Sequence, residues 1–310
     1  MDQIQKAQKA KSLIFMVEPT SFRCNEETLT TNAFQTQTTH LTNNLNQSAL
    51  NEFKMLTQTL TAYGINVHVE KDLIERDTPD AIFPNNWVSF HENGKVLLYP
   101  MQAENRRRER SLNFIHQIAK SNDFKLNQVI DLSHEEANGR YLEGTGSIVF
   151  DHYNHKAYAS LSERTDRALF HQVCKILNYT GISFHSHDNN QVPIYHTNVM
   201  MAIGDFFAVI CTDSINDVTQ KNKLLDSLSN DHKEIIDISL KQMQHFCANI
   251  IQLITTDHQP VIVMSKTAYN AFDTLQKEKL SRYGDIIYSD ISTIETYGGG
   301  SVRCMICEVS

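Results

Sequence analysis

The sequence predicts an α/β fold built from a repeated unit of two strands, a helix and a third strand (ββαβ). The same order of patterns recurs along the 310 residues at a spacing of roughly 55 residues, which is typical of a modular architecture. In each unit two short β-type runs joined by a turn precede a helix whose apolar residues recur every three to four positions. Each unit also opens on a polar residue. If the units surround one axis, these opening residues meet at a single site.

The elements follow in order from the patterns. Four units begin at Asn86, Glu143, His196 and, more faintly, Asn249. In this order, their strand pairs are expected in 87–100, 146–161, 198–212 and 250–265, and their helices near 105–120, 164–178, 216–228 and 266–282. Their third strands are expected at 128–132, 182–185, 234–238 and 285–289. The last unit begins at Gly298 with the run 301–309. The N-terminal run 13–19, a helix around 49–60 that ends at Gly64, and a strand at 65–69 could complete it. A hairpin turn is expected at ENGK around Gly94.

We expect one catalytic domain over residues 1–310, with the last and the N-terminal strands sharing the closing unit. No low-complexity linker divides the chain, although 310 residues would suffice for two average domains.

Composition and charge exclude several classes of function. No run approaches the roughly 20 apolar residues of a membrane span, and the polar N-terminus lacks the apolar stretch of a signal peptide. A cytoplasmic protein without a membrane partner is therefore expected. The net charge of −8 argues against nucleic acid as a partner. The basic run 106–110 opens a predicted helix, and a solvated helix face is its expected setting.

Six cysteines are spread through the chain, which fits reduced thiols in a cytoplasmic protein. Cys304 and Cys307 have the C-x-x-C spacing, but both lie in the terminal β-type run. Residues three apart on a strand face opposite sides of the sheet, so this spacing is unsuited to a metal site. Neither a metal nor another cofactor is expected, and no phosphate-binding glycine loop is visible.

Three opening residues together suggest catalysis. Cys304 follows a glycine-rich approach, His196 starts a mostly apolar strand, and Glu143 stands beside glycines. A cysteine, a histidine and a carboxylate on separate elements form the usual set for an activated thiolate nucleophile. Each residue taken singly is more often structural, and only the shared position in the repeat favours the functional interpretation.

The chain resembles, over essentially its whole length, the guanidino-group-modifying enzymes of the pentein fold. These include arginine deiminases, dimethylarginine dimethylaminohydrolases, agmatine deiminases, succinylarginine dihydrolase and amidinotransferases. The segments that carry the resemblance are MVEPTSFRCN, DAIFPNNW, YLEGTGSIVFD, LSERTD, YHTNVMMAI and GGGSVRC. The sequence is most similar to the branch called citrulline-utilisation hydrolase, or citrulline ureidase.

This resemblance implies a five-bladed α/β propeller of ββαβ modules. It implies that Cys304 is the covalent nucleophile, His196 the general acid and base, and Glu143 the acid that orients or charges the histidine. Arg164 in LSERTD matches an arginine that holds the substrate carboxylate. Arg106 is taken as a second such arginine, although any residue of 106–108 could fill that place.

Other matched positions concern the substrate. Methylarginine hydrolases of the family have an aspartate where Asp80 stands, and acidic residues that bind guanidinium where Asn85 and Asn86 stand. Phe22 and Asn25 fall in a segment that covers the substrate in relatives.

The two asparagines favour a neutral substrate group. A guanidinium has only donors and pairs naturally with a carboxylate, whereas an amide has both a donor and an acceptor and suits a ureido group. Asn85 and Asn86 therefore indicate citrulline rather than arginine as the small-molecule substrate. Succinylarginine dihydrolase has an asparagine in a similar stretch and still takes a guanidinium, so a deiminase or dihydrolase acting on arginine or methylarginine, or an amidinotransferase, stays open.

In the expected reaction the Cys304 thiolate attacks the ureido carbon, and His196 protonates the departing nitrogen. Ornithine leaves, and water then releases carbamate, which yields ammonia and carbon dioxide. The thiolate would be stabilised either by protonated His196 or by a cationic substrate. The alternative from another class is a pentein-fold binding protein, but such proteins lack the Cys, His and Glu set. The sequence leaves open whether the chain forms a homo-oligomer.

Overall fold

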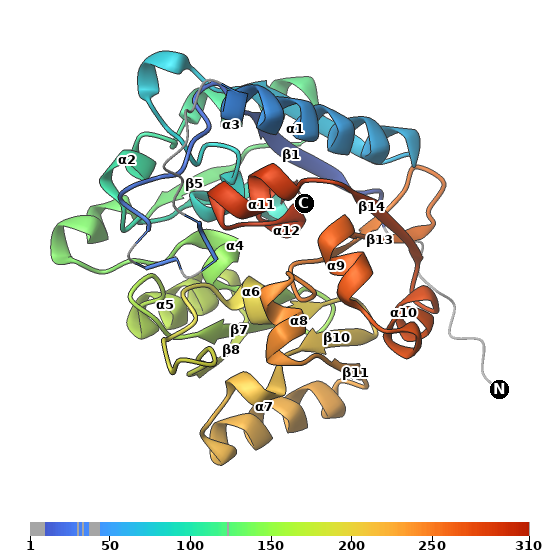
Figure 1. The fold of residues 1–310 in the computed structure, drawn as a ribbon. Helices are drawn as coiled ribbons and strands as arrows, with labels where there is room; N and C mark the ends of the chain where they lie inside the picture. The colour runs from blue at the N-terminus through green and yellow to red at the C-terminus, as the bar shows by residue number, and fades with distance from the viewer. Residues whose placement is uncertain (1–9, 30, 33, 37–43, 123, 310) are drawn as a thin grey trace.

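The structure, a computed structural model, describes residues 10–29, 31–32, 34–36, 44–122 and 124–309. Its strands form five three-stranded sheets (Figure 1). In every sheet the middle strand pairs antiparallel with one neighbour and parallel with the other. The predicted α/β class and the repeated strand order are confirmed.

Four sheets each come from one continuous stretch of chain. They are β3 (Val88–His91), β4 (Lys95–Leu98) and β5 (Gln128–Asp131); β6 (Val149–Asp151), β7 (Lys156–Ser160) and β8 (Thr180–Phe184); β9 (Met201–Ile203), β10 (Phe207–Ile210) and β11 (Glu234–Asp237); and β12 (Ile251–Ile254), β13 (Pro260–Ser265) and β14 (Asp285–Ser289). In the fifth sheet β1 (Leu13–Glu18) pairs in parallel with β2 (Asn66–Lys71) and antiparallel with β15 (Cys307–Val309). This sheet therefore brings strands from the two ends of the chain together.

Helices connect the second and third strands of each sheet and lie around the outside of the molecule (Figure 1). They are α1 (Leu45–Ala62), α3 (Leu112–Ser121), α5 (Arg167–Leu177), α7 (Val218–Asn230), and the consecutive helices α9 (Lys266–Ala271) and α10 (Thr274–Ser281). Helix α1 buries four apolar side chains spaced three to four residues apart, Ala49, Phe53, Leu56 and Leu60. Gly64 follows it at φ +78, a conformation that glycine adopts without strain.

The predicted helix at 105–120 is in fact two helices, α2 (Glu104–Arg107) and α3. The side chain of Ser111 accepts a hydrogen bond from the Phe114 backbone N–H and so begins α3 as its N-cap. Arg106 and Glu109 lie before this cap and are buried. The expected solvated face is therefore wrong for Arg106. Two further short helices, α8 (Leu240–Gln244) and α11 (Ser292–Gly298), were not predicted.

The first strand of each sheet lies inside the molecule. Strands β3 and β6 are buried along their whole length, whereas β5, a third strand, is mostly exposed. First strands of different sheets pack against one another: β15 against β3, β6 against β9, and β9 against β12. The residues that precede these strands are therefore brought close together.

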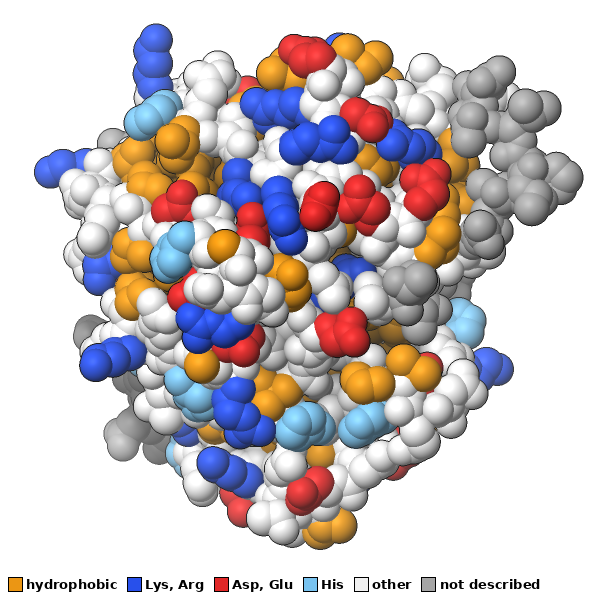
Figure 2. All heavy atoms as spheres, turned by 90° about the vertical axis from the view of Figure 1, so that its left-hand side faces the viewer, with side chains coloured by type: hydrophobic (Ala, Val, Ile, Leu, Met, Phe, Trp, Pro, Cys, Tyr) orange, Lys and Arg blue, Asp and Glu red, His pale blue; other side chains and the backbone are white. Residues whose placement is uncertain are grey.

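The surface carries charges of both signs. On the face shown in Figure 2, basic side chains lie among acidic ones. Within the described ranges, no helix is long and apolar enough to cross a membrane.

Candidate active site

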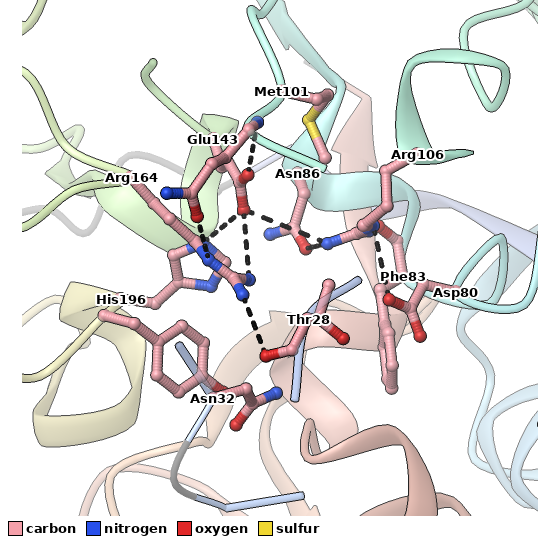
Figure 3. A network of polar contacts seen from close by, with 12 residues as sticks. Thr28, Asn32, Asp80, Phe83, Asn86, Met101, Arg106, Glu143, Arg164 and His196 are labelled. Atoms are coloured by element: carbon pink, nitrogen blue, oxygen red, sulfur yellow. Dashed lines mark hydrogen bonds and ion pairs between the residues drawn. The ribbon is translucent and has the colours of Figure 1, made fainter. Parts of the chain in front are cut away.

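One small pocket is lined by residues from distant parts of the chain. Its lining residues are Asn32, Asp80, Phe83, Asn86, Arg106, Arg164, Tyr195, His196, Gly298, Gly299, Gly300 and Cys304. Glu143 lies against this set, with its Oε2 atom 2.8 Å from Nε2 of His196 (Figure 3). A larger hollow, lined in part by Asn198, contains none of the three predicted catalytic side chains. The described residues hold no group of three or more His, Cys, Asp or Glu placed to bind a metal.

The three predicted catalytic residues lie at one-turn helices that precede the first strands. Glu143 comes directly before α4 (Gly144–Ser147), His196 directly before α6 (Thr197–Met200), and Cys304 lies within α12 (Val302–Met305). Their assignment to strands was wrong for His196 and Cys304. All four residues of α6 and three of the four in α12 are buried, so their apolar residues show no helical period that could distinguish them from a strand.

This correction separates the two cysteines. Cys304 belongs to α12, whereas Cys307 begins β15 and its thiol contacts the carbonyl oxygen of Val88. Both thiols are buried. Of the two, Cys304 is the one that lines the pocket.

Glu143 is a buried, ionised carboxylate. It is fully buried, and Oε1 accepts a hydrogen bond from the backbone N–H of Gln102. Its Oε2 atom lies 3.6 Å from Nη1 of Arg164. Burial acts to raise the pKa of Glu143, but Arg164 and the hydrogen bond from His196 outweigh this effect and hold the pKa well below its usual range.

His196 is a neutral imidazole at neutral pH. Burial lowers the pKa of His196 to about 4, and Glu143 opposes this only in part. An ionised carboxylate can only accept hydrogen bonds, so Nε2 carries the imidazole proton and donates a hydrogen bond to Glu143. Nδ1 then keeps its lone pair. Gly146 lies beside it, because a Cβ at that position would be 2.8 Å from Nδ1 and 2.4 Å from Nδ2 of Asn86.

Cys304 is a buried thiol held by two amides. Its sulfur accepts hydrogen bonds from Nδ2 of Asn249 at 3.3 Å and Nδ2 of Asn198 at 3.5 Å. Burial raises the pKa of Cys304, and these amides oppose it. Among the described contacts, the sulfur has no hydrogen bond to His196. With a neutral His196, this arrangement is not a thiolate–imidazolium pair.

The three residues predicted to bind the substrate, Asp80, Asn85 and Asn86, are in different environments. Asp80 and Asn86 line the pocket, and within the described part of the chain Oδ1 of Asp80 and Nδ2 of Asn86 have no hydrogen-bond partner. Burial raises the pKa of Asp80, with Arg106 acting in the opposite direction. Asn85 is fully buried outside the pocket lining, and neither atom of its amide finds a partner among the described residues.

Arg106 lines the pocket, but protein groups already bind its guanidinium. Nε and Nη2 donate to the two carboxylate oxygens of Glu109 at 2.8 and 3.0 Å. Nη1 donates to Oδ1 of Asn86 at 2.9 Å (Figure 3). This engagement does not favour the expected role of Arg106 as a second anchor for a substrate carboxylate.

Arg164 is also buried, but part of its environment comes from the N-terminal segment. Nε donates to Oε1 of Gln102 at 3.1 Å, and Nη2 donates to Oγ1 of Thr31 and to the carbonyl of Thr28. Its guanidinium carbon lies 5.2 Å from the centre of the Tyr195 ring. The hydroxyl contact is one that a substrate carboxylate can replace.

The segment that contains Phe22 and Asn25 packs against two residues of the pocket, Asp80 and Gly298. Nδ2 of Asn25 donates to Oδ2 of Asp80 at 2.7 Å, and Phe22 is buried near Gly298. The prediction did not include Asn198 and Asn249. Asn249 was identified as the opening residue of the fourth unit, so its position in the repeat was a signal that it faces the site.

Comparisons with known proteins identify one matching family and several solved structures with a similar fold. The model of the family described as N,N dimethylarginine dimethylhydrolase, eukaryotic, matches residues 18–310. No curated protein matches the sequence.

Several solved structures share the fold. The N-terminal domain of ArgZ bound to product, an arginine dihydrolase from the ornithine-ammonia cycle in cyanobacteria, has 18% identity and a TM-score of 0.74 over 97% of this chain and 98% of that chain. AgrE in a ternary complex with ornithine and NAD+ has 15% identity and a TM-score of 0.75 over 97% of this chain, which spans 39% of AgrE. A mutant of DDAH from Pseudomonas aeruginosa complexed with citrulline has 16% identity and a TM-score of 0.63, covering 96% of this chain and 99% of that chain.

Proposed function

The chain belongs to the N,N dimethylarginine dimethylhydrolase family, and from that premise we propose that it is a cysteine-dependent hydrolase that cleaves citrulline to ornithine, ammonia and carbon dioxide. We further propose that the five sheets are the blades of one α/β propeller and that residues 1–310 form a single catalytic domain. The packing of first strands against one another supports this arrangement.

The orientation of the Asn86 amide is the observation that favours citrulline over arginine as the substrate. Arginine can only donate hydrogen bonds, so Nη1 of Arg106 holds the oxygen of Asn86 toward itself. The Asn86 nitrogen therefore points away from Arg106, and it is buried without a partner in the described chain (Figure 3). A donor at this position suits the carbonyl oxygen of a ureido group, whereas the N–H groups of a guanidinium would leave it unpaired.

In the proposed reaction the Cys304 sulfur bonds to the ureido carbon. Neutral His196 takes the thiol proton at Nδ1, and the ionised Glu143 stabilises the resulting imidazolium. The bond between the carbon and the δ-nitrogen then breaks, and His196 returns the proton so that ornithine leaves as an amine. The carbamoyl group stays on the sulfur.

The second half of the reaction uses the same base. His196 takes a proton from water, whose oxygen attacks the carbamoyl carbon, and the carbon–sulfur bond breaks to restore the thiol. The released carbamate decomposes to ammonia and carbon dioxide. In the first half of the reaction, before ornithine leaves, Arg164 is proposed to bind the substrate α-carboxylate in place of the Thr31 hydroxyl.

One observation favours a second candidate, an arginine-cleaving hydrolase. The Oδ1 atom of Asp80 is a carboxylate oxygen in the pocket without a hydrogen-bond partner among the described residues, and it suits a cation. A cationic substrate would also favour the thiolate form of Cys304. ArgZ, which shares the fold, is an arginine dihydrolase.

Product analysis separates the two candidates. Purified protein should be incubated with citrulline, arginine, agmatine and methylarginines, with the Cys304→Ala variant as the blank, and the amine products should be identified. The proposal predicts ornithine and ammonia from citrulline at the highest kcat/KM. If arginine is turned over efficiently and citrulline only slowly, the second candidate, an arginine-cleaving hydrolase, replaces the proposed citrulline hydrolase. If neither substrate is turned over, both candidate functions are contradicted.

A further inference from the structure

Asn249 links the catalytic thiol to the fourth sheet. It is fully buried and stands shortly before β12. Its Nδ2 atom donates to the Cys304 sulfur at 3.3 Å and to the carbonyl oxygen of Asn198 at 3.0 Å. Its Oδ1 atom accepts a hydrogen bond from the backbone N–H of Arg303 at 3.0 Å. All three groups belong to the two short turns, α6 and α12, that carry the site.

These partners fix the direction of the Asn249 amide. A backbone N–H only donates and a carbonyl oxygen only accepts, so Oδ1 must face Arg303 and the NH₂ group must face the carbonyl of Asn198. The remaining N–H is therefore directed at the sulfur. Asn198 differs, because its Oδ1 atom also lies 3.8 Å from the sulfur and can accept from a thiol. Asn249 is committed to donating.

A committed donor stabilises the thiolate over the thiol, because hydrogen bonds to an ionised sulfur are stronger than those to a neutral one. The other charged and titratable groups around Cys304 are those of the pocket (Asp80, Arg106, Arg164, Tyr195 and His196) and the adjacent Arg303. His196 is neutral and Arg106 is bound by Glu109, so neither supplies a free cation to the sulfur.

We propose that Asn249 is a catalytic residue whose amide donates to the Cys304 thiolate, while its oxygen tethers the turn that carries the cysteine. The inference rests on the proposed function only in taking Cys304 as the nucleophile. It does not depend on whether the substrate is citrulline or arginine. Every one of the four complete units then contributes its opening residue to the site: Asn86, Glu143, His196 and Asn249.

The test measures the thiolate without a substrate. The rate of alkylation by iodoacetamide should be followed against pH in a Cys24→Ser background, which removes the half-buried thiol, with the added Cys304→Ser variant as the baseline. Asn249→Asp keeps an oxygen for the Arg303 N–H but replaces the donor with a charged acceptor. The apparent pKa of Cys304 should rise by about one to two units, the scale of one hydrogen bond to a charged group.

Two further variants keep the test decisive if the aspartate variant does not fold. Asn249→Ala removes the donor without adding charge and should raise the pKa of Cys304 more than Asn198→Ala does. The limiting rate at high pH should stay close to that of the parent protein, because the thiolate itself is unchanged. Folded Asn249 variants with the parent pKa, or a rise confined to Asn198→Ala, would overturn the proposal. If the parent protein itself does not turn over citrulline, that result would instead count against the proposed substrate.

Discussion

Replacing Asn86 by aspartate exchanges an amide nitrogen that has no hydrogen-bond partner among the described residues for a carboxylate oxygen. The contact from Nη1 of Arg106, 2.9 Å from Oδ1 in the present structure, can persist because a carboxylate also accepts. The substitution is nearly isosteric, so the main change is in the hydrogen-bonding character of one buried atom. Citrulline should lose its partner at this atom, and arginine should gain one.

The size of the change follows from these two effects. Leaving the citrulline carbonyl opposite an acceptor costs about 1–3 kcal/mol, and a new hydrogen bond between a carboxylate and a guanidinium contributes about 1.5–3 kcal/mol. Together they should shift the ratio of kcat/KM for citrulline to that for arginine by roughly 10²- to 10⁴-fold toward arginine, since about 1.4 kcal/mol is a factor of ten.

The assay measures ornithine release from each substrate, with citrulline also quantified when arginine is supplied. Asn85→Asp is the matched control. Asn85 is buried outside the pocket lining and its amide has no partner among the described residues, so a carboxylate there should lower stability and leave the substrate ratio nearly unchanged. If Asn86→Asp leaves the ratio unchanged, or if the control shifts it equally, the argument from amide orientation is wrong.

Other expectations concern the catalytic groups. Cys304→Ser should abolish turnover with the fold retained, whereas Cys307→Ser should stay active because, among the described residues, its buried thiol forms hydrogen bonds only to backbone carbonyls; steady-state rates and circular dichroism test both. Arg164→Ala should raise KM roughly 30-fold or more for amino-acid substrates, the effect of losing about 2–5 kcal/mol, and much less for an amine without the carboxylate; equal losses would make Arg164 structural. Glu143→Gln removes the carboxylate that raises the pKa of His196 and stabilises its imidazolium, so kcat should fall roughly 10²- to 10⁴-fold. In the wild type the neutral base persists down to low pH, and a pH profile of kcat/KM should show activity lost as pH falls through the pKa of His196, about 4; loss already near pH 6.5 would contradict the burial argument.

The repeated pattern was sufficient to predict the sheets. Strand pairs and returning strands are set by short apolar runs and by turn residues such as Gly94, which lies at φ +66 in the hairpin between β3 and β4. These are local signals, and each sheet except the fifth comes from one stretch of chain. The helices were predicted less well, because Ser111 and Asp273 begin new helices inside patterns that look continuous.

The sequence also identified which residues come together, through their equivalent positions in the repeat and the resemblance to a family. The pocket brings Cys304, His196 and Asp80 together, although more than 200 residues separate the first and last of them. Asn249 could have been included on the same grounds.

Only the tertiary structure decided what each polar group can still bind. Arg106, Asn85 and Asn86 belong to segments that look equally suited to a substrate. Arg106 is bound by Glu109 and Asn86, and Asn85 is buried outside the pocket. The Asn86 nitrogen has no hydrogen-bond partner in the part of the chain that the structure describes. Hydrogen-bond partners and burial depend on atoms of other helices, strands and loops. A linear pattern contains no information about which of these atoms lie beside a given side chain in the folded protein. The direction of an amide is decided by its neighbours, not by its own residue type.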